Sequence, residues 1–343
     1  MKKAILSIGN RGADVAPLQK VLHYLINAPL KVDGIFGANT DYWVKIFQHR
    51  NKLKVDGIVG QKTYLALERN LEAAKRFIVT IDAGHGGVIG GKYTTMENGK
   101  GKYYIHGGEN FGHLPSNPAM FCEGVYNRQI AKLLERALFY HIDKHYGGVD
   151  DELTYIGTYW GRGDKDDKVY ISKDSPLNDR PLEDRVAHAN KIFSSTGCSG
   201  LNISLHSNAG KARGIIVFTN IGTSFSDYCS MEVLQAFQRD EVFANMQWKH
   251  KKYGVLPYIW TKDNKDYATQ KSDHEKRFYV LRNLEGKPYS NRVGSILIEN
   301  DFFDNREGAK FISNPANQKR YVECLVEGIK RIKEESIKRI PKL

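Results

Sequence analysis

Three short runs of apolar and β-branched residues constrain the fold of this chain most, because each leads into a side chain that can bind a metal or move a proton. The first run is Phe77–Ala83, and the glycine-flanked His85 follows it. The second ends at His206, and the third, which is strongly apolar, ends at Glu299. Runs of this length and composition predict buried strands. We therefore expect an α/β domain with a mixed open sheet flanked by helices, in which a site forms beyond the strands' carboxyl ends.

A fourth candidate, Glu123, stands where a helix is expected to begin. Apolar residues at helical spacing follow it, from Ile130 to Leu138. A carboxylate in the first turn of a helix is stabilised by the helix dipole whether or not it has another role. Glu123 therefore has two interpretations, as a helix-stabilising charge or as a metal ligand.

Two histidines and two glutamates at such positions suit one particular chemistry. Two histidines and one carboxylate are a ligand set for catalytic zinc, which leaves a fourth position open for water. The metal lowers the pKa of that water and polarises a scissile carbonyl. A second glutamate that is not a ligand can then serve as general base and proton donor.

The N-terminal part contains an internal repeat. Residues 33–37 read Asp-Gly-Ile-Phe-Gly and residues 56–60 read Asp-Gly-Ile-Val-Gly, and a threonine, Thr40 or Thr63, follows each at the same spacing. The glycines suit tight turns, and each threonine is expected to cap a helix start through its hydroxyl. Helical stripes of apolar residues lie beside the turns. The pattern predicts a small all-α three-helix domain over residues 1–72.

This first part resembles a known domain. The string Gly-x-x-Val-x-x-Leu-Gln from Gly12 to Gln19, the two Asp-Gly-Ile-x-Gly turns and the pair Phe47-Gln48 look like the peptidoglycan-binding domain of wall-lytic enzymes. The resemblance implies bacterial peptidoglycan as the partner. The same residues would also build a helical bundle without any ligand, so the peptidoglycan-binding residues stay unassigned.

The remainder, residues 77–343, is expected to form one catalytic domain. It contains five further motifs: Val79 to Gly87, Glu123 with Asn127, Leu182 to Asn190, Ser204 to Ala209, and Glu299 with Phe302 and Asn305. Through these motifs, roughly residues 77–335 resemble the zinc N-acetylmuramoyl-L-alanine amidases of the amidase-3 type. The resemblance implies one Zn²⁺ per chain, held by His85, Glu123 and His206, with Glu299 as the catalytic carboxylate. It also implies the bond that is cut, the amide between N-acetylmuramic acid and the L-alanine of the stem peptide.

The chain also departs from the family pattern. Two insertions are expected, near 88–122 and 220–290, and the second is predicted to begin with a helix from Tyr228 to Trp248. Asp301 stands where the family typically has glycine. Four residues of the first insertion are rival ligands to Glu123: Glu97, His106, Glu109 and His113.

Three further residues have supporting roles in this interpretation. Asp82 and Asn208 are expected to orient the metal ligands. Arg185 is expected to hold an ion pair within the fold rather than to contact the substrate.

Composition limits the partners. The formal net charge is +12, which favours anionic partners. The charge is spread along the chain, so nucleic-acid binding is not expected, and no apolar stretch approaches the length of a membrane span. The monomer is favoured, although the sequence does not define the oligomeric state. The four cysteines have no metal-site or disulfide-framework spacing and are expected to be reduced thiols: Cys122, Cys198, Cys229 and Cys324.

The first residues, MKKAILSIGN, contain too short an apolar run for a signal peptide. This favours a phage endolysin that folds in the host cytoplasm without a signal peptide, and acts at the cell wall or periplasm after release. Two alternatives stay open at this point. One is a zinc peptidase that cuts within the stem peptide, and the other is a non-catalytic wall-binding protein.

Overall fold

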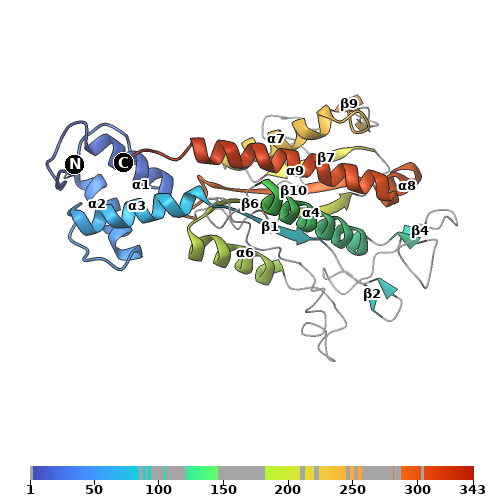
Figure 1. Cartoon of the computed structure of the whole chain (residues 1–343), viewed down its shortest axis with the longest axis horizontal. Helices are drawn as coiled ribbons and strands as arrows, with labels where there is room; N and C mark the ends of the chain where they lie inside the picture. The colour runs from blue at the N-terminus through green and yellow to red at the C-terminus, as the bar shows by residue number, and fades with distance from the viewer. Residues whose placement is uncertain are drawn as a thin grey trace.

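The computed structural model shows a group of helices at one end and a sheet flanked by helices beyond it (Figure 1). The residues that it describes are 3–84, 88–89, 92–93, 104–105, 120–121, 123–145, 182–208, 213–219, 224–244, 248–250, 254–256, 281, 287–302 and 305–343.

The N-terminal unit contains the three predicted helices, α1 (Val15–Ile26), α2 (Ala38–Arg50) and α3 (Gln61–Lys75). Their apolar faces meet in a core of their own, in which Leu18, Leu22 and Phe47 are fully buried. The all-α three-helix prediction is therefore confirmed.

The internal repeat is a repeated hydrogen-bond pattern around a buried glutamine. Gln48 accepts hydrogen bonds from the backbone N–H groups of Asp56 and Gly57, and its amide donates to the Asp56 carboxylate, the Ile58 carbonyl and the Thr63 hydroxyl. Gln19 makes the same five contacts to the first turn. These bonds satisfy the buried polar groups of each turn.

The predicted threonine caps are wrong. Helices α2 and α3 begin after Gly37 and Gly60, and neither start has a side-chain cap. Thr40 and Thr63 lie inside the first turns, and their hydroxyls donate back to the carbonyls of Ile35 and of Ile58. Each threonine hydroxyl instead accepts a hydrogen bond from its glutamine amide and so helps to fix that glutamine.

The central sheet has four strands in the order β1-β6-β10-β7. Strands β1 (Phe77–Ala83), β6 (Ser199–Asn208) and β10 (Val293–Phe302) run parallel, and β7 (Ile215–Thr219) pairs antiparallel with β10. The sheet is open and mixed, as predicted. Its three parallel strands all finish at the end far from the N-terminal helices (Figure 1).

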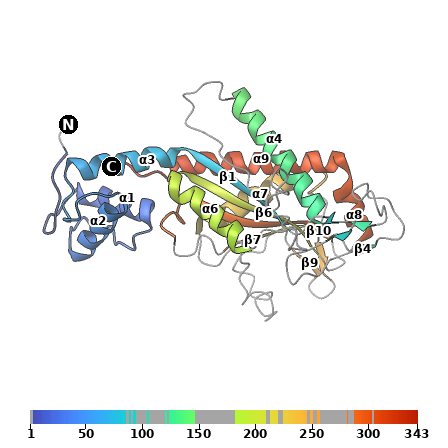
Figure 2. The same cartoon turned by 90° about the horizontal axis from the view of Figure 1, so that it is seen from below.

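Helices cover both faces of this sheet (Figure 2). Alternate residues of β1 and β6 pack with α4 (Glu123–His145), α7 (Ser224–Arg239) and α9 (Pro315–Lys338) in the main core. The other face packs against α6 (Leu182–Thr196), where Phe193 meets Ile78 and Val293. A short helix, α8 (Arg306–Ser313), joins β10 to α9.

Part of the second predicted insertion belongs to the core. The expected helix from Tyr228 to Trp248 is displaced: α7 begins at Ser224 and ends at Arg239, and Trp248 starts a strand. Among the described residues of the two predicted insertions, three two-stranded ribbons are found. They are β2 (Val88–Ile89) with β3 (Lys92–Tyr93), β4 (Tyr104–Ile105) with β5 (Met120–Phe121), and β8 (Trp248–His250) with β9 (Gly254–Leu256).

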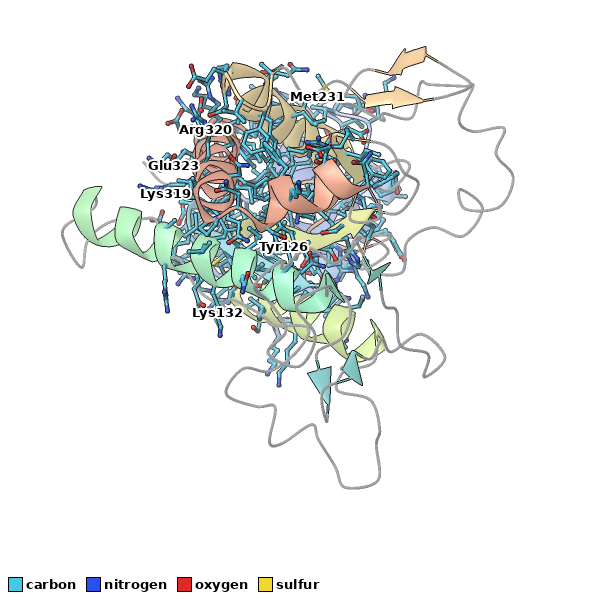
Figure 3. The ribbon with its side chains drawn as sticks, turned by 90° about the vertical axis from the view of Figure 1, so that its right-hand side faces the viewer. Tyr126, Lys132, Met231, Lys319, Arg320 and Glu323 are labelled. Atoms are coloured by element: carbon cyan, nitrogen blue, oxygen red, sulfur yellow. The ribbon has the colours of Figure 1, made fainter. Side chains whose placement is uncertain are left out.

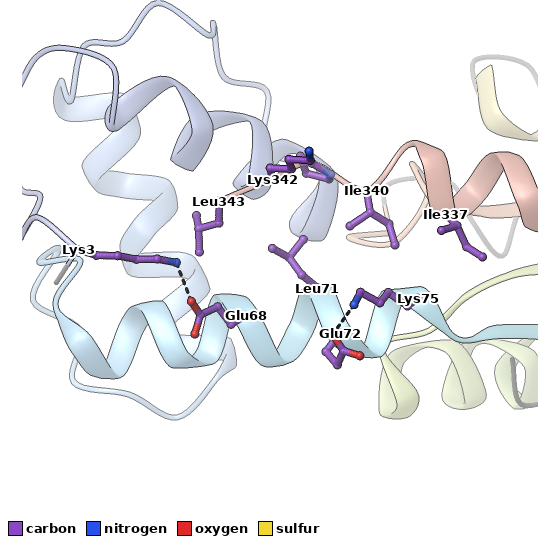
Figure 4. A pocket seen from close by; sticks show the side chains of 10 residues that line it. Lys3, Glu68, Leu71, Glu72, Lys75, Ile337, Ile340, Lys342 and Leu343 are labelled. Carbon is purple, nitrogen blue, oxygen red and sulfur yellow. Dashed lines mark hydrogen bonds and ion pairs between the residues drawn. The ribbon is translucent and has the colours of Figure 1, made fainter. Parts of the chain in front are cut away.

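The C-terminal segment returns to the N-terminal helices. Ile340 and Leu343 pack against the core of the three-helix unit, beside Leu71 of α3 (Figure 4). An ion pair between Lys3 and Glu68 closes the same pocket at 2.6 Å. Residues from both ends of the chain thus line one pocket beside α3.

Two further properties of the described residues bear on the predictions. None of their helices is long and apolar enough to cross a membrane. Cys198, Cys229 and Cys324 are buried free thiols, as expected, and Cys122 lies outside the described residues.

Candidate active site

The parallel strands bring two of the predicted residues together. Glu299 of β10 is the register partner of His206 on β6, so the two lie side by side on adjacent strands near the strand ends. Gly84, the residue that precedes His85, follows β1 directly and donates its N–H to the Leu205 carbonyl at 2.8 Å. Figure 3 looks toward this end of the sheet, with Tyr126 of α4 labelled near it.

Gly84 is a glycine for a steric reason. A Cβ atom at this position would overlap the His206 ring, so any side chain would displace the imidazole. The close approach places Gly84, the residue before His85 in the sequence, directly against His206. The absence of a side chain at Gly84 therefore allows the end of β1 to approach the His206 ring closely.

A hydrogen-bond chain fixes the His206 ring. The Ser204 hydroxyl donates to the Asp82 carboxylate at 2.8 Å, and His206 Nε2 lies 3.1 Å from the same hydroxyl oxygen. Because the hydroxyl has one hydrogen and gives it to Asp82, its contact with Nε2 requires an N–H on the imidazole. The neutral ring then carries its lone pair on Nδ1. This is the arrangement in which a neighbouring group sets the tautomer of a metal-binding histidine.

The first turns of α4 are hydrogen-bonded to Gly84, the residue that follows β1. Asn127 is buried, and its amide donates to the Gly84 carbonyl at 3.1 Å. Glu123 is the first residue of α4, one helical turn before Asn127, so it shares that side of the helix. The backbone positions next to three predicted ligands therefore converge at the ends of β1 and β6.

Strand β10 is irregular after Glu299. Its register with β6 shifts between Glu299 and Phe302, and Asp301 has a φ of 100°, in the left-handed region that favours glycine. This explains why glycine suits position 301. Asp301 compensates through its carboxylate, which pairs with Arg213 at 2.9 Å and accepts the Gly214 N–H at 2.8 Å.

Burial also changes the acidity of that carboxyl group. It raises the pKa of Asp301 to about 6, while the Arg213 charge and the backbone donors oppose the rise. Asp301 is fully buried, whereas Glu299 is half-buried at the strand end. The two neighbouring acids therefore differ in burial: Asp301 is enclosed in the fold, whereas Glu299 is partly exposed.

Several predicted residues stay untested. His85 and the rival ligands of the first insertion lie outside the described residues. For Glu123, Asn208 and Arg185 the backbone is described, at the start of α4, the end of β6 and within α6, but the side chains are not. Within the described part of the chain, no group of three His, Cys, Asp or Glu side chains is placed to hold a metal.

Two residues near the site were not predicted. Ser204 links Asp82 to His206, and Arg213 neutralises Asp301. The spacing of Ser204, two residues before His206 on the same face of a strand, could have indicated the first. No local pattern connects Arg213 to Asp301, because 88 positions separate them.

The fold and these strand ends define an α/β protein that places histidine and carboxylate side chains beyond a parallel sheet edge, joined to a helical module. Comparison with known families is more specific. The chain belongs to the N-acetylmuramoyl-L-alanine amidase family, whose model matches residues 79–331. A second model, the putative peptidoglycan binding domain, matches residues 11–67.

Curated relatives match over shorter stretches. A spore cortex-lytic enzyme of Oceanobacillus iheyensis is 30% identical over 118 residues, which cover 33% of this chain and 42% of the relative. One of Halalkalibacterium halodurans is 32% identical over 74 residues, 22% of each protein. The matches thus span less than half the length of these relatives.

Among solved structures, an N-acetylmuramoyl-L-alanine amidase from Clostridium difficile 630 is similar, with 20% identity and a TM-score of 0.43. That similarity covers 75% of this chain and 97% of the other.

Proposed function

We propose that this chain hydrolyses the amide bond between N-acetylmuramic acid and the L-alanine of the peptidoglycan stem peptide. The observation that carries the proposal is the pairing of His206 with Glu299 on adjacent parallel strands, in a chain of the amidase family. The match to a peptidoglycan-binding domain supports the same substrate. A non-catalytic wall-binding protein would have no need for the hydrogen-bond chain that orients His206.

We propose a zinc site at this end of the sheet, which two contacts of the described residues support. His85, Glu123 and His206 would hold the ion, since Gly84 lies against the His206 ring and Asn127 ties the first turn of α4 to Gly84. His206 would bind through Nδ1, because its Nε2 contacts Ser204. Bound zinc supplies an acidified water and polarises the scissile carbonyl.

The chain's own residues then have distinct roles. Glu299 takes a proton from the attacking water and returns one to the leaving amine of L-alanine. Its half-buried position suits a carboxylate that must be reached by substrate. Asp82 and Ser204 hold the His206 ring in one tautomer and one orientation. The N-terminal helices keep the enzyme at the wall.

The first prediction is that Glu299→Gln abolishes nearly all turnover but keeps zinc and wall binding. The amide keeps the shape of the side chain and cannot accept the proton, so a loss of about 10²- to 10⁴-fold is expected. Mass spectrometry of digested peptidoglycan measures the products, and metal analysis measures zinc. Glu307→Gln, an exposed glutamate of α8, is the matched control and should have normal activity.

The same digest distinguishes the alternatives. New L-alanine N-termini with intact glycan support the amidase, whereas a cut within the stem peptide would support a zinc peptidase. Substantial activity of Glu299→Gln would refute the assigned role. His206→Ala should lose zinc, and retention of stoichiometric zinc would contradict its role as a ligand.

The biological setting that we propose is host cell lysis by a phage endolysin, made in the host cytoplasm and acting at the wall after release. The spore cortex-lytic relatives favour a second setting, the degradation of spore cortex. Digests of vegetative walls and of spore cortex, run side by side, separate the two. Activity on cortex alone would exclude the endolysin role.

A further inference from the structure

A concave site lies at the opposite end of the sheet from His206 and Glu299. It is a cavity of about 540 Å³ between the N-terminal helices and the sheet domain. Arg76 before β1, Gly197 before β6 and Arg292 before β10 mark its position at the strand starts. A volume of this size is typical of small-ligand sites.

Arginines dominate the lining of this cavity. Four of them contribute, and no aspartate or glutamate appears among the described lining residues. We call the cavity the arginine groove. Its four arginines are Arg50, Arg69, Arg76 and Arg292.

Their charges are not neutralised by the described part of the protein. Arg50 and Arg76 form no ion pair there, and Arg69 contacts only the Asn51 side-chain oxygen, at 3.5 Å. A cluster of like charges without counter-charges costs free energy. An anionic ligand would remove that cost.

Arg292 provides an independent observation. It is 6% exposed, and its Nη1 donates to the carbonyls of Tyr24 and Leu25 at the end of α1. Its buried Nε has no hydrogen-bond partner. Burial lowers the pKa of this guanidinium, and no carboxylate offsets the effect. A buried cation with an unsatisfied donor at the wall of a cavity indicates a missing anionic partner.

We propose that the arginine groove binds a carboxylate of a peptidoglycan stem peptide, and this inference rests on the proposed function. Guanidinium groups present paired donors that match a carboxylate. Both parts of the chain contribute: Arg50 and Arg69 come from the N-terminal helices, and Thr196 and Tyr289 from the sheet domain. The wall substrate itself carries such carboxylates, so no additional partner is required.

The groove holds a different stem peptide from the one that is cut. Ser199 and His206 lie seven residues apart on β6, which corresponds to about 23 Å at the usual rise of a strand. A single short stem peptide bound at the strand ends does not occupy the strand starts as well. The groove therefore increases the affinity of the protein for polymeric walls. It leaves the rate of cleavage of a small soluble muramoyl-peptide unchanged.

The test compares the full chain with the double variant Arg50→Gln, Arg69→Gln. Both side chains are exposed, so the fold should persist, and Arg292 stays unchanged because it also holds α1. The matched control is Arg11→Gln, Lys62→Gln, which removes the same charge from exposed positions outside the groove. Sedimentation with purified peptidoglycan freed of phosphate polymers measures binding.

The groove variant should bind this peptidoglycan roughly tenfold more weakly, because charge-assisted hydrogen bonds are lost. The control should bind normally, and both should cleave a soluble muramoyl-peptide at the wild-type rate. Wild-type protein should bind carboxyl-esterified peptidoglycan as weakly as the variant binds the native polymer. Normal binding by the groove variant, an equal loss in the control, or a defect confined to walls that carry phosphate polymers would overturn the proposal.

The result of the groove binding test does not depend on the proposed amidase activity. The binding measurements can be made with Glu299→Gln as the background, which does not require turnover. If the digest shows no amidase product while the groove variant still loses peptidoglycan binding, the proposed function fails and the groove assignment stands. If the digest shows the amidase product and binding is unchanged, the groove assignment fails alone.

Discussion

At the two Asp-Gly turns of the N-terminal unit, a single buried amide contacts several parts of the chain at once. Gln48 is 1% exposed and links the end of α2 to the turn before α3. The hydrogen bond from the Ile58 N–H and then the one from Gln48 lower the pKa of the Asp56 carboxyl. The charged form of Asp56 is therefore part of the folded turn.

Gln48→Leu should destabilise the protein by about 2 kcal/mol, because the N–H groups of Asp56 and Gly57 lose their acceptor. Chemical denaturation measures the change, and Gln61→Leu, at an exposed position, is the control. A carboxyl with a lowered pKa contributes stability above its ordinary pKa of 3.8 and loses it as the pH falls through the folded value. The loss in free energy of unfolding caused by Gln48→Leu should therefore be smaller in acid. A loss that becomes larger there would contradict this account.

At the scale of elements, the sequence predicts a strand best where burial alone determines its bounds. The strand Phe77–Ala83 matches β1 because all seven residues are buried. Strands β6 and β10 continue past His206 and Glu299, to Asn208 and Phe302. Within the strands, polar residues pair across the sheet. Thr80 donates to Asn202, which donates to Ser295, and these partners are 122 and 93 positions apart. Such pairings cannot be read from local pattern.

Helix α9 illustrates the opposite case. No motif marks it, yet its buried residues at Val322, Leu325, Ile329 and Ile332 follow helical spacing and could have identified it.

The candidate site also contains one part that the sequence predicts and one part that it does not. His206 and Glu299 were predicted from strand ends, whereas the contact of Gly84 with the His206 ring depends on the pairing of β1 with β6.

The bulge at the end of β10 leads to a prediction about Asp301→Gly. Glycine would relieve the positive φ, but the variant loses the ion pair with Arg213 and the acceptor for the Gly214 N–H. Because Arg213 is 30% exposed, we expect a moderate net destabilisation of about 1–2 kcal/mol. Asp301→Asn keeps an acceptor and should lose less. Thermal unfolding checks the order, and a glycine variant more stable than the wild type would mean that backbone strain dominates.

At the scale of the whole molecule, the N-terminal unit is docked by specific contacts rather than tethered by a free linker. Helix α3 runs directly into β1, and the Ser199 hydroxyl donates to the Ala74 carbonyl at 2.6 Å. Asn291 donates to the His23 carbonyl and to the Asn27 side chain, both at 2.9 Å. A fixed junction gives the arginine groove a defined shape, and it sets the distance between that groove and the His206–Glu299 pair.

The C-terminal segment strengthens this junction, because it connects α9 in the sheet domain to the core of the three helices. Ile340→Ala with Leu343→Ala removes partly buried apolar surface and should cost about 1–2 kcal/mol. The three helices should then exchange their amide hydrogens faster, while amides of β6 keep their protection. Ile5→Ala with Ile8→Ala, at positions 70% and 60% exposed, is the control. Equal loss of protection in both parts would show that the two parts open only together, and that the segment stabilises the whole molecule rather than its N-terminal unit.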